Sequence, residues 1–441
     1  MTPVIHNASE VTEDRAAEYF AQIYKDRLAY CHSAGSWYEY DGSIWRQHKT
    51  PLAFHYAREL MRDLSRNLAS PGQFQKTRFA LGVEKFAQAD PVFSRTSEHW
   101  NPDPFLLGTP AGTVDLKTGR LRSAIPSDKI NRSTATPPSN MGCPKWLSFL
   151  HGATGGDHEL VRFLQQIAGY SLTGLTTEHA LFFIYGGGGN GKSVFIDTLT
   201  RIAGEYAQTA AMTTFERQDN SSIPADLAML DGARLVTASE TEEGRPWAEA
   251  RIKQMTGGDP ITARFMRQNF FTFTPRFKLV IVGNHKPVLK SVDDAMKRRF
   301  NIIPFTIKPQ KPDKELSKKL EAEYPGILQW AIEGCLDWQK NGLIRPKSVT
   351  IATNKYFAEQ NVLQQWMDQF CEVDLDNSYL FEPAKSLFAS YAKFLNDYGE
   401  NKTTMKAFSQ ALQREGFVND RSKHGVYYRH IRLKTAVDEN D

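Results

Sequence analysis

Hydrophobic and polar positions follow one pattern in the middle of the chain and another toward its ends. Between Ala180 and Phe305, short apolar runs alternate with stretches of helical spacing, which is typical of an α/β domain with a largely parallel sheet. Helical spacing is also present just before this region, near Pro144–Leu147 and across Glu159–Gly169. The sequence therefore predicts a central sheet with accompanying helices.

The region before the centre mixes helices with β-hairpins. Helical spacing over 16–28 and 52–68 accompanies two predicted hairpins, one around the turn Asp41-Gly42 and one over 112–121. Glycine supplies the positive φ that such tight turns need. Residues 132–144 are rich in Ser, Thr, Pro and Gly, and we expect them to form a connector.

The region after the centre is predicted to be mainly helical. Residues 313–341 have helical spacing, and Asp374–Asn377 is predicted to form a turn. The last segment, 381–433, predicts a helix, a second helix and a β-hairpin.

Composition excludes several classes of protein. Of the 441 residues, 41% are hydrophobic, which is enough for a packed core and excludes a wholly disordered chain. The net charge is only +4, so contact with nucleic acid has to come from local clusters. No apolar run approaches the roughly 20 residues that span a bilayer, and the first residues do not resemble a secretory signal. The four cysteines, Cys31, Cys143, Cys335 and Cys371, lie far apart in the sequence. Their spacing predicts neither a disulfide framework nor a zinc-binding pair, and it favours a reducing cytosolic compartment.

A glycine-rich loop directly follows the buried-strand run Ala180–Tyr185. It matches the pattern G-x-x-x-x-G-K-[ST] in full, and an amphipathic helix over 194–202 follows it. The glycines let backbone N–H groups turn toward an anion, and the helix N-terminus adds partial positive charge. The lysine of such a loop reaches the β- and γ-phosphates, and the serine ligates Mg²⁺. We therefore expect ATP and Mg²⁺ as cofactors, with Ser193 as a metal ligand and a nucleotide-binding set of Gly186, Gly187, Gly188, Gly189, Asn190, Gly191, Lys192, Ser193 and Val194.

An acidic residue ends a later apolar run, Gly232–Glu240. A carboxylate at this position holds magnesium or orients the attacking water. Glu240 is therefore the candidate base and second metal ligand. Many such strands end in two acids, whereas Ser239 supplies no charge here, and Glu242 lies beyond the apolar run and is a weaker candidate.

An amide and two arginines complete the predicted catalytic set. Asn284 follows the apolar run 277–283 and can donate to the γ-phosphate or position water. Arg298 and Arg299 precede another apolar run, and a guanidinium from a neighbouring subunit would stabilise charge in the transition state. The sequence does not choose between these two arginines. The predicted catalytic residues are Lys192, Glu240, Asn284, Arg298 and Arg299.

The interval from Lys253 to Phe271 interleaves cations with aromatic residues. This combination suits tracking of a single-stranded backbone together with base stacking. Lys253, Arg264 and Arg267 are the candidate DNA contacts. The alternative is an ordinary hairpin with exposed cations and buried phenylalanines.

A second basic region lies near the end of the chain. Residues 401–434 hold eight lysines and arginines against two acids, a net +6. A helix over 404–414 followed by a basic hairpin over 416–433 predicts a winged helix that contacts duplex phosphates. Lys406, Arg421 and Lys423 are the candidates, and the alternative is a wing that binds protein.

The order of these motifs resembles superfamily 3 helicases, and more closely the phage/plasmid primase–helicase family with its poxvirus-type NTPase relatives. The resemblance implies an AAA+-like P-loop core and a hexameric ring that hydrolyses ATP and translocates on single-stranded DNA. It also assigns Glu240 as the Walker-B acid, Asn284 as the sensor and Arg298 or Arg299 as the finger. Besides the glycine loop and the paired arginines, the residues that carry the resemblance are Ser239–Gly244, Thr256–Asp259, Asn284, Trp37, Asp41-Gly42 and Trp45.

The resemblance divides the chain into five expected parts. They are a flexible tail over 1–15, a mixed α+β domain over 16–143, the superfamily 3 ATPase domain over 144–310, a helical extension over 311–345 and a helical, winged-helix DNA-binding domain over 346–441. The residues before the ATPase motifs do not look like a primase, so we expect priming to need a separate polypeptide.

The expected function is that of a replicative DNA helicase of a phage, plasmid or prophage element. Its expected partners are single-stranded and forked DNA, further copies of itself, a separate primase and host replication proteins. No membrane is involved, and the expected location is the cytoplasm of a bacterial host cell. Two alternatives remain open: a P-loop ATPase that loads a helicase, and a DNA-binding replication initiator or regulator that does not unwind.

Overall fold

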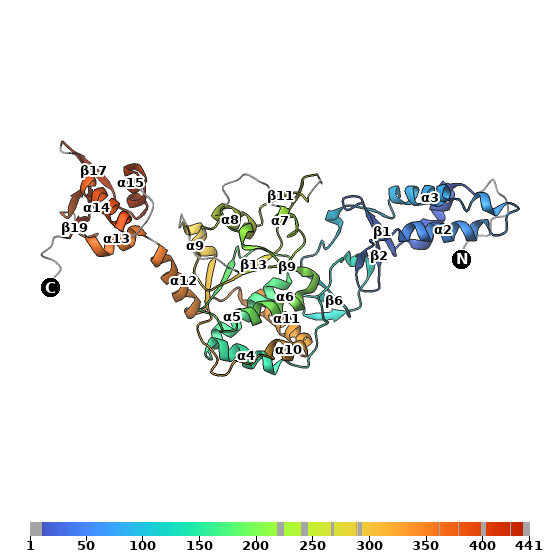
Figure 1. The fold of residues 1–441 in the computed structure, drawn as a ribbon, viewed down its shortest axis with the longest axis horizontal. Coiled ribbons are helices and arrows are strands. Elements are labelled where there is room, and N and C mark those ends of the chain that lie inside the picture. Colours follow the sequence, from blue (N-terminus) through green and yellow to red (C-terminus); the bar gives the residue numbers. More distant parts are fainter. Residues whose placement is uncertain are drawn as a thin grey trace. The chain divides into compact units, whose positions relative to one another are not determined.

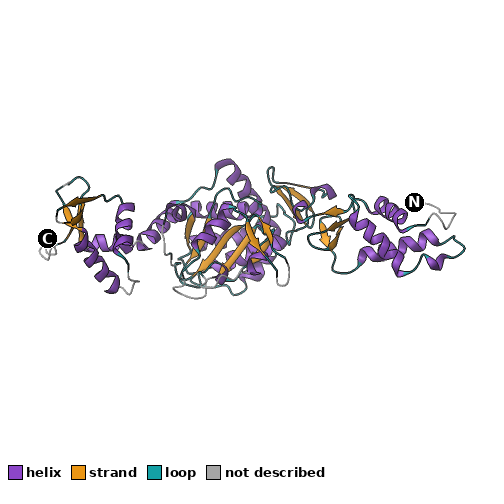
Figure 2. Cartoon of the chain, turned by 90° about the horizontal axis from the view of Figure 1, so that it is seen from above, coloured by secondary structure: helices purple, strands orange, loops and turns teal. Residues whose placement is uncertain are grey.

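The computed structural model describes residues 11–217, 225–239, 246–265, 269–287, 289, 293–360, 362–377, 379–397, 403–423 and 425–434 (Figures 1 and 2). The chain divides into two compact units. The first comprises Met1–Pro287 with Arg298–Thr350, and the second comprises Val288–Lys297 with Ile351–Asp441. Within the described ranges, no helix is long and apolar enough to cross a membrane.

The first unit begins with an α+β region in which three helices accompany a small sheet. Its elements are α1 (Glu13–Tyr24), β1 (Leu28–Cys31), β2 (Ser36–Tyr40), β3 (Trp45–Gln47), α2 (Leu52–Ser65), α3 (Thr77–Ala89) and β4 (Ser94–Arg95), and the strand order is β3-β2-β1-β4. Helix α1 begins three residues before the expected start because the Thr12 side chain caps it by accepting from Arg15 N. The hairpin predicted around Asp41-Gly42 is confirmed by the β2–β3 pairing, and Gly42 has φ 98°.

A second small sheet links this region to the centre of the unit. It contains β5 (Leu106–Thr109), β6 (Gly112–Asp115) and β7 (Arg120–Arg122) in sequence order. The antiparallel β6–β7 pair confirms the second predicted hairpin. Apart from a 3-10 turn at Pro126–Asp128, the chain then has no helix or strand until Pro144, as expected for a connector.

The centre of the first unit is a five-stranded, wholly parallel sheet, which confirms the predicted α/β fold (Figure 2). Its strands are β8 (Leu181–Tyr185), β9 (Ala207–Thr209), β10 (Leu235–Ser239), β13 (Lys278–Gly283) and β14 (Phe300–Pro304). Their order is β14-β8-β13-β10-β9, and each neighbouring pair is parallel. The strands β8 and β13 are almost wholly buried, which explains why they read as continuous apolar runs.

Helices pack on this sheet (Figure 1). One continuous apolar core joins strand residues such as Phe182 and Val280 to residues of α5, α6 and α11. The helices of this unit before and after the strands are α4 (Pro144–Thr154), α5 (His158–Leu172), α6 (Lys192–Ala203), α7 (Ala225–Ala228), α8 (Glu249–Gly257), α10 (Leu316–Glu321) and α11 (Tyr324–Asn341). Two further helices, α9 (Asp294–Arg299) and α12 (Lys347–Gln360), each include residues of both units. A separate antiparallel hairpin of β11 (Ile261–Ala263) and β12 (Phe271–Phe273) lies between α8 and β13 in the sequence.

The second unit has its own apolar core, which includes Trp366, Phe408 and Tyr428. Its elements are α13 (Val362–Phe370), β15 (Cys371–Val373), β16 (Phe381–Pro383), α14 (Ala384–Asp397), α15 (Met405–Arg414), β17 (Asn419–Ser422), β18 (Gly425–Arg429) and β19 (Ile431–Leu433). The predicted helix, helix and hairpin are therefore present as α14, α15 and β17–β18. The hairpin is joined by β16, which the sequence did not predict, in a sheet of order β16-β18-β17. The winged-helix assignment itself stays a prediction.

Candidate nucleotide site

The carboxyl ends of three neighbouring strands are in register at one edge of the central sheet. Tyr185, the last residue of β8, pairs with Gly283 of β13 on one side and with Pro304 of β14 on the other. On the next strand along, Ser239 at the end of β10 pairs with Val282. Because parallel strands end at the same edge, the segments that follow them converge there, as they do at ligand sites of open α/β sheets.

The glycine loop fills the space after β8 and leads directly into α6. Gly188, Gly189 and Gly191 all have positive φ, between 68° and 89°, which other residues adopt only with strain. A Cβ on Gly186 would overlap the carbonyl oxygen of Phe305. That same carbonyl accepts a hydrogen bond from the Asn190 side-chain amide. Two loop residues therefore lie against the same carbonyl of Phe305, directly after β14, and one of them donates a hydrogen bond to it.

Lys192, the first residue of α6, directly follows the glycine loop and is buried, with 6% of its surface exposed. Its ammonium donates to Gly186 O at 2.5 Å, to Asn190 Oδ1 at 3.1 Å and to Asn284 Oδ1 at 3.1 Å. Burial, and secondarily the positive charge of Lys308, lower the pKa of Lys192. The predicted loop lysine and the predicted sensor amide are thus brought together, although they are 92 residues apart in sequence.

A cavity of about 1170 Å³ opens onto this loop. Its polar end is formed by Gly188–Val194 with Ser239 and Asn284, and Lys145, Lys311 and Lys319 also line it. Its apolar part comes from α4 and from the segment after β14, and is lined by Phe149, Ala153, Ile307, Pro309, Pro312 and Leu316. Phe149 lies against the loop, since a Cβ on Gly191 would come within 2.6 Å of its ring.

The residues of this cavity fit a nucleoside triphosphate with magnesium. The turned loop, the start of α6 and the Lys192 ammonium supply N–H donors and positive charge, as polyphosphates require. Ser193 also lines the cavity, and a serine hydroxyl is an oxygen ligand of the kind that suits a hard cation such as Mg²⁺. An apolar part with a few polar groups is what a nucleobase needs. Glu240, the predicted base and second metal ligand, lies outside the described residues, directly after Ser239.

The two candidate finger arginines have different surroundings. The Arg299 side chain is buried, and its Nε donates to Thr256 Oγ1 of α8 at 3.3 Å. The Arg298 side chain is exposed, while its carbonyl oxygen accepts from Arg345 Nη2 at 3.3 Å. Neither residue is among those that line the cavity of its own chain. Of the two, only Arg298 presents its side chain to the outside, where a neighbouring subunit could meet it.

The DNA-contact candidates are in three places. Arg264 lies just beyond β11 and is exposed, with its guanidinium 4.9 Å from the centroid of the Phe270 ring. The rings of Phe265 and Phe271 are stacked, with their centroids 5.7 Å apart. Lys253 is half-buried on α8, and Arg267 lies outside the described residues. In the second unit, exposed side chains on α15 and on the β17–β18 hairpin belong to Lys406, Arg421 and Lys423.

Sequence reasoning missed the apolar part of the cavity and the role of Lys308. Phe149 and Ile307 lie on opposite sides of the P-loop motif in the sequence, separated by more than 150 residues, so no local pattern joins them. The available signal for Phe149 was its place just after the helical spacing near Pro144–Leu147, at the start of the expected ATPase domain. Nothing in the local sequence distinguishes Lys308 from other lysines of the Lys308–Lys319 segment.

Two protein families and several viral proteins match parts of the chain. Residues 17–155 match the D5 N terminal like family, and residues 184–299 match a family of unknown function (DUF5906). The chain is 27% identical over 314 residues to "Putative helicase L207/L206" of Acanthamoeba polyphaga mimivirus, a match that covers 66% of this chain and 32% of that protein. It is 23% identical over 326 residues to "Putative helicase 022R" of Frog virus 3, covering 66% and 33% respectively. The chain thus spans about a third of the length of these relatives.

The fold is also similar to a solved structure, the apo A form of the NrS-1 C-terminal region. The TM-score is 0.54 at 10% identity, and the match covers 94% of this chain and 99% of that one. At this identity the likeness concerns the fold alone. Together with the matched families, it confirms the resemblance that the motifs predicted. The chain is therefore a homologue of viral proteins named as helicases, and it contains a D5 N-terminal-like domain of the kind expected for the primase–helicase family.

Proposed function

We propose that this chain is an ATP-dependent replicative DNA helicase of a phage, plasmid or prophage element. The observation that carries the proposal is the buried Lys192 ammonium. It lies at the carboxyl ends of the parallel strands, between the glycine loop and Asn284. A buried cation that faces a large cavity is arranged to receive an anion. The names of the viral relatives support DNA unwinding as the use of that site.

The proposed site residues divide the work on the triphosphate. The loop N–H groups and Lys192 hold the β- and γ-phosphates, and Asn284, already within reach of Lys192, contacts the γ-phosphate or its attacking water. Ser193 and Glu240 would hold Mg²⁺, which when bound neutralises phosphate charge. Glu240 would also take the proton of the attacking water. The finger arginine comes from an adjoining protomer, so the proposal includes a ring, with a hexamer as the family expectation.

The β11–β12 hairpin is the proposed contact with single-stranded DNA. Exposed Arg264 beside the exposed rings of Phe265 and Phe270 combines a phosphate contact with surfaces for base stacking. Six such hairpins around one channel would concentrate positive potential although the net charge is near zero. The proposed role of the second unit is to hold duplex DNA through Lys406, Arg421 and Lys423.

Hydrolysis and strand displacement, measured on the same preparation, test the proposal. We expect DNA-stimulated ATP hydrolysis and ATP-dependent displacement of a strand from a forked duplex, and loss of both in Lys192→Ala because the phosphate cation is removed. Lys340→Ala is the matched control, since Lys340 is an exposed lysine at the end of α11 that does not line the cavity. Stimulated hydrolysis without displacement would favour a helicase loader or replication initiator. Unchanged hydrolysis in Lys192→Ala would refute the assignment of the site.

A further inference from the structure

The P-loop helix α6 is anchored at its far end by the connector that follows the N-terminal domain. Ala135 N donates to Ile202 O at 3.0 Å, and Glu205 N donates to Ser133 O at 3.0 Å. Gly204, which ends the helix, has φ 57°, and a Cβ there would lie within 2.8 Å of Ala135 N and Ser133 O. The connector and the end of α6 are therefore joined with no space for a side chain between them.

The connector also joins α6 to the strand that leads to the predicted catalytic acid. Arg132 donates through Nη1 to Glu205 O at 2.6 Å and through Nη2 to Asp231 O at 2.8 Å. Asp231 lies just before β10, whose end carries Ser239 and then Glu240. One guanidinium thus links the end of the P-loop helix to the start of the Walker-B strand.

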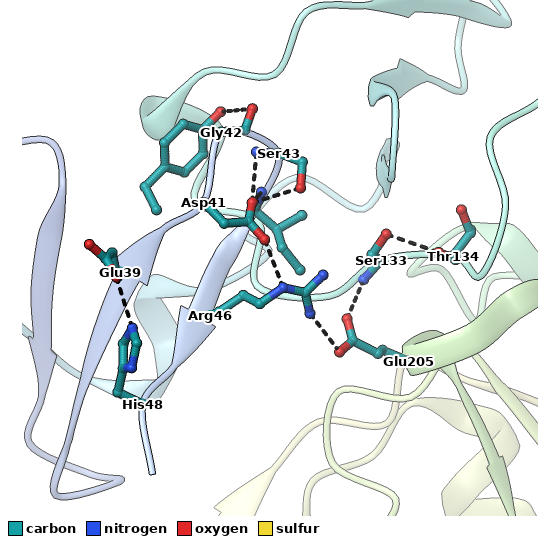
Figure 3. Close-up of polar contacts among 11 residues, drawn as sticks. Glu39, Asp41, Gly42, Ser43, Arg46, His48, Ser133, Thr134 and Glu205 are labelled. Carbon is teal, nitrogen blue, oxygen red and sulfur yellow. Dashed lines mark hydrogen bonds and ion pairs between the residues drawn. The ribbon is translucent and has the colours of Figure 1, made fainter. Parts of the chain in front are cut away.

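Glu205 extends this anchor to the N-terminal domain (Figure 3). One carboxylate oxygen, Oε2, accepts from Ser133 N at 2.7 Å, and the other, Oε1, accepts from Arg46 Nη1 at 3.2 Å. Arg46 belongs to β3, and its Nε donates to Asp41 Oδ2 at 2.7 Å. The Glu205 carboxylate therefore bridges the connector and the β2–β3 hairpin.

The hairpin turn holds Arg46 in the direction of Glu205. The second oxygen of Asp41 accepts from Ser43 N at 2.8 Å, from Ser43 Oγ at 2.7 Å and from Ile44 N at 2.9 Å. These bonds fix the Asp41 carboxylate, and the fixed carboxylate fixes the guanidinium. The result is a continuous row of polar contacts from the hairpin turn, through Arg46 and Glu205, to the end of α6.

Stability alone does not account for this arrangement. The Arg46 and Glu205 side chains are 49% and 48% exposed, and an ion pair so accessible to solvent contributes little to folding. What the pair does is define where the end of α6 lies relative to the hairpin. Lys192 and Ser193 occupy the first turn of the same helix, so a small displacement of its end is transmitted to the proposed phosphate site.

We infer that Glu205 is a positioning residue for the proposed phosphate site, and that through Arg46 the N-terminal domain sets the affinity of the P-loop for triphosphate. The inference rests on the proposed function and extends it, because it assigns a role to the N-terminal domain. It also explains the Asp41-Gly42 turn, which the nucleotide site itself does not use.

Nucleotide affinity of variants of the whole 441-residue chain tests the inference. We would measure the Kd of a fluorescent ATP analogue for the wild type, Arg46→Met and Glu205→Gln, which keep the shape of each side chain but remove the ion pair. Each variant is expected to bind about two- to fivefold more weakly, the range of an exposed pair. Arg62→Met is the matched control: Arg62 is also 49% exposed and pairs with Glu59, but both residues lie on α2. It should bind as the wild type does.

The double variant Arg46→Met with Glu205→Gln separates positioning from independent effects. If the two residues act through one contact, the double variant loses no more affinity than the worse single variant. Arg46→Lys, which keeps the charge, should recover part of the loss, and added salt should reduce the difference from the wild type. Equal affinity in Arg46→Met and the wild type, or single losses that simply multiply, would overturn the inference.

A readout without nucleotide distinguishes failure of the inference from failure of the proposed function. Amide hydrogen exchange of the connector and the last turn of α6 should be faster in Arg46→Met than in Arg62→Met. If the wild type binds no nucleotide, the proposed function fails, and the claim about affinity fails with it. If the wild type binds nucleotide but neither affinity nor exchange responds to Arg46→Met, the proposed function stands and the inference alone is wrong.

Discussion

Lys192 is a lysine whose ammonium is satisfied before any ligand arrives. It donates to a loop carbonyl and to the amide oxygens of Asn190 and Asn284. Neutral oxygens stabilise a buried cation less well than a phosphate does, because they carry only partial charge. If a bound phosphate replaced the Asn284 oxygen, it would gain a strong contact with Lys192, and Asn284 would be released beside it. This exchange connects phosphate binding to the position of the proposed sensor.

The lowered pKa of Lys192 predicts a pH dependence of nucleotide binding. Burial is the larger cause and the charge of Lys308 the second. Only the protonated lysine attracts phosphate, so affinity should be full below this lowered pKa and should fall as the pH rises through it. Lys308→Met removes the second cause, and the fall should move to higher pH. The measurement is the Kd of the fluorescent ATP analogue between pH 7 and pH 10.5, the ordinary pKa of a lysine side chain.

Lys340→Met controls for a general effect of removing a positive charge. Lys340 is an exposed residue of α11 and is not among the residues that line the cavity, so its loss should leave the pH profile unchanged. Identical profiles for Lys308→Met and the wild type would contradict the assigned electrostatic effect of Lys308.

The paired arginines show what residue-level reasoning from sequence can and cannot do. The motif predicted an arginine just before β14, the last strand of the sheet in sequence order. Because Arg298 and Arg299 are adjacent and identical, the sequence does not show which side chain is exposed to a neighbouring subunit. Packing supplies that information: Arg299 donates to Thr256, 43 residues earlier, and is buried. Arg298 is left exposed. The choice depends on a contact between α9 and α8, which no local pattern encodes.

At the scale of elements, the packing of α5 against α11 depends on two glycines. A Cβ on Gly169 would overlap the backbone of Gly334 and Cys335, and a Cβ on Gly334 would overlap Gln165 O. The two helix backbones therefore approach more closely than side chains would permit. Residues of both helices belong to the core that supports β8 and the glycine loop.

Gly169→Ala should consequently destabilise the first unit strongly, by about 3 kcal/mol or more, as overpacking against backbone does. Gly152→Ala is the control, because a Cβ at Gly152 on α4 meets nothing within 4 Å. Alanine at that helical position should be neutral or stabilise by about 0.5–1 kcal/mol. Thermal and denaturant unfolding of the two variants would measure the difference, and similar midpoints would contradict the close approach of α5 and α11.

The sequence predicted a helix or strand correctly where the local pattern of hydrophobic and polar residues determines which of the two forms. The run 180–185, the glycine loop and the helix after it, and both hairpins, were found as β8, α6, β2–β3 and β6–β7. The strand β16 was missed, because Phe381–Pro383 is three residues long, contains proline and is a strand only through its pairing with β18. The apolar part of the cavity was missed because α4 and the segment after β14 meet only in the folded chain.

At the scale of the whole molecule, the proposed function expects a neighbouring protomer to complete the cavity. Among the described residues that line it there are four lysines, Lys145, Lys192, Lys311 and Lys319, but no arginine. Hydrolysis of a triphosphate is commonly accelerated by a guanidinium, which an adjoining subunit can supply. Because Arg298 is exposed and does not line the cavity of its own chain, it is suited to a neighbour's cavity.

Mixing two inactive variants tests this arrangement directly. Lys192→Ala removes the phosphate cation but keeps Arg298, and Arg298→Ala keeps the cavity but removes the finger. Each variant alone should hydrolyse almost no ATP. In an equal mixture, a quarter of the interfaces combine an intact cavity with an intact finger, so hydrolysis should recover to about a quarter of the wild-type rate if rings exchange subunits freely. The measurement is steady-state hydrolysis across a range of mixing ratios.

A second mixture controls for nonspecific rescue. Lys192 and Glu240 are proposed to act in the cavity of one and the same chain, so Lys192→Ala mixed with Glu240→Gln leaves every cavity defective and should recover nothing. Recovery in this mixture as well would mean that activity returns without a shared site. No recovery in either mixture, with rings verified by their mass in solution, would place the finger elsewhere than Arg298. In the first mixture, the Arg298→Ala subunit supplies the intact cavity and its Lys192→Ala neighbour supplies the intact arginine, so only this mixture can restore activity. A parabolic dependence of the hydrolysis rate on the mixing ratio would identify a site shared between protomers.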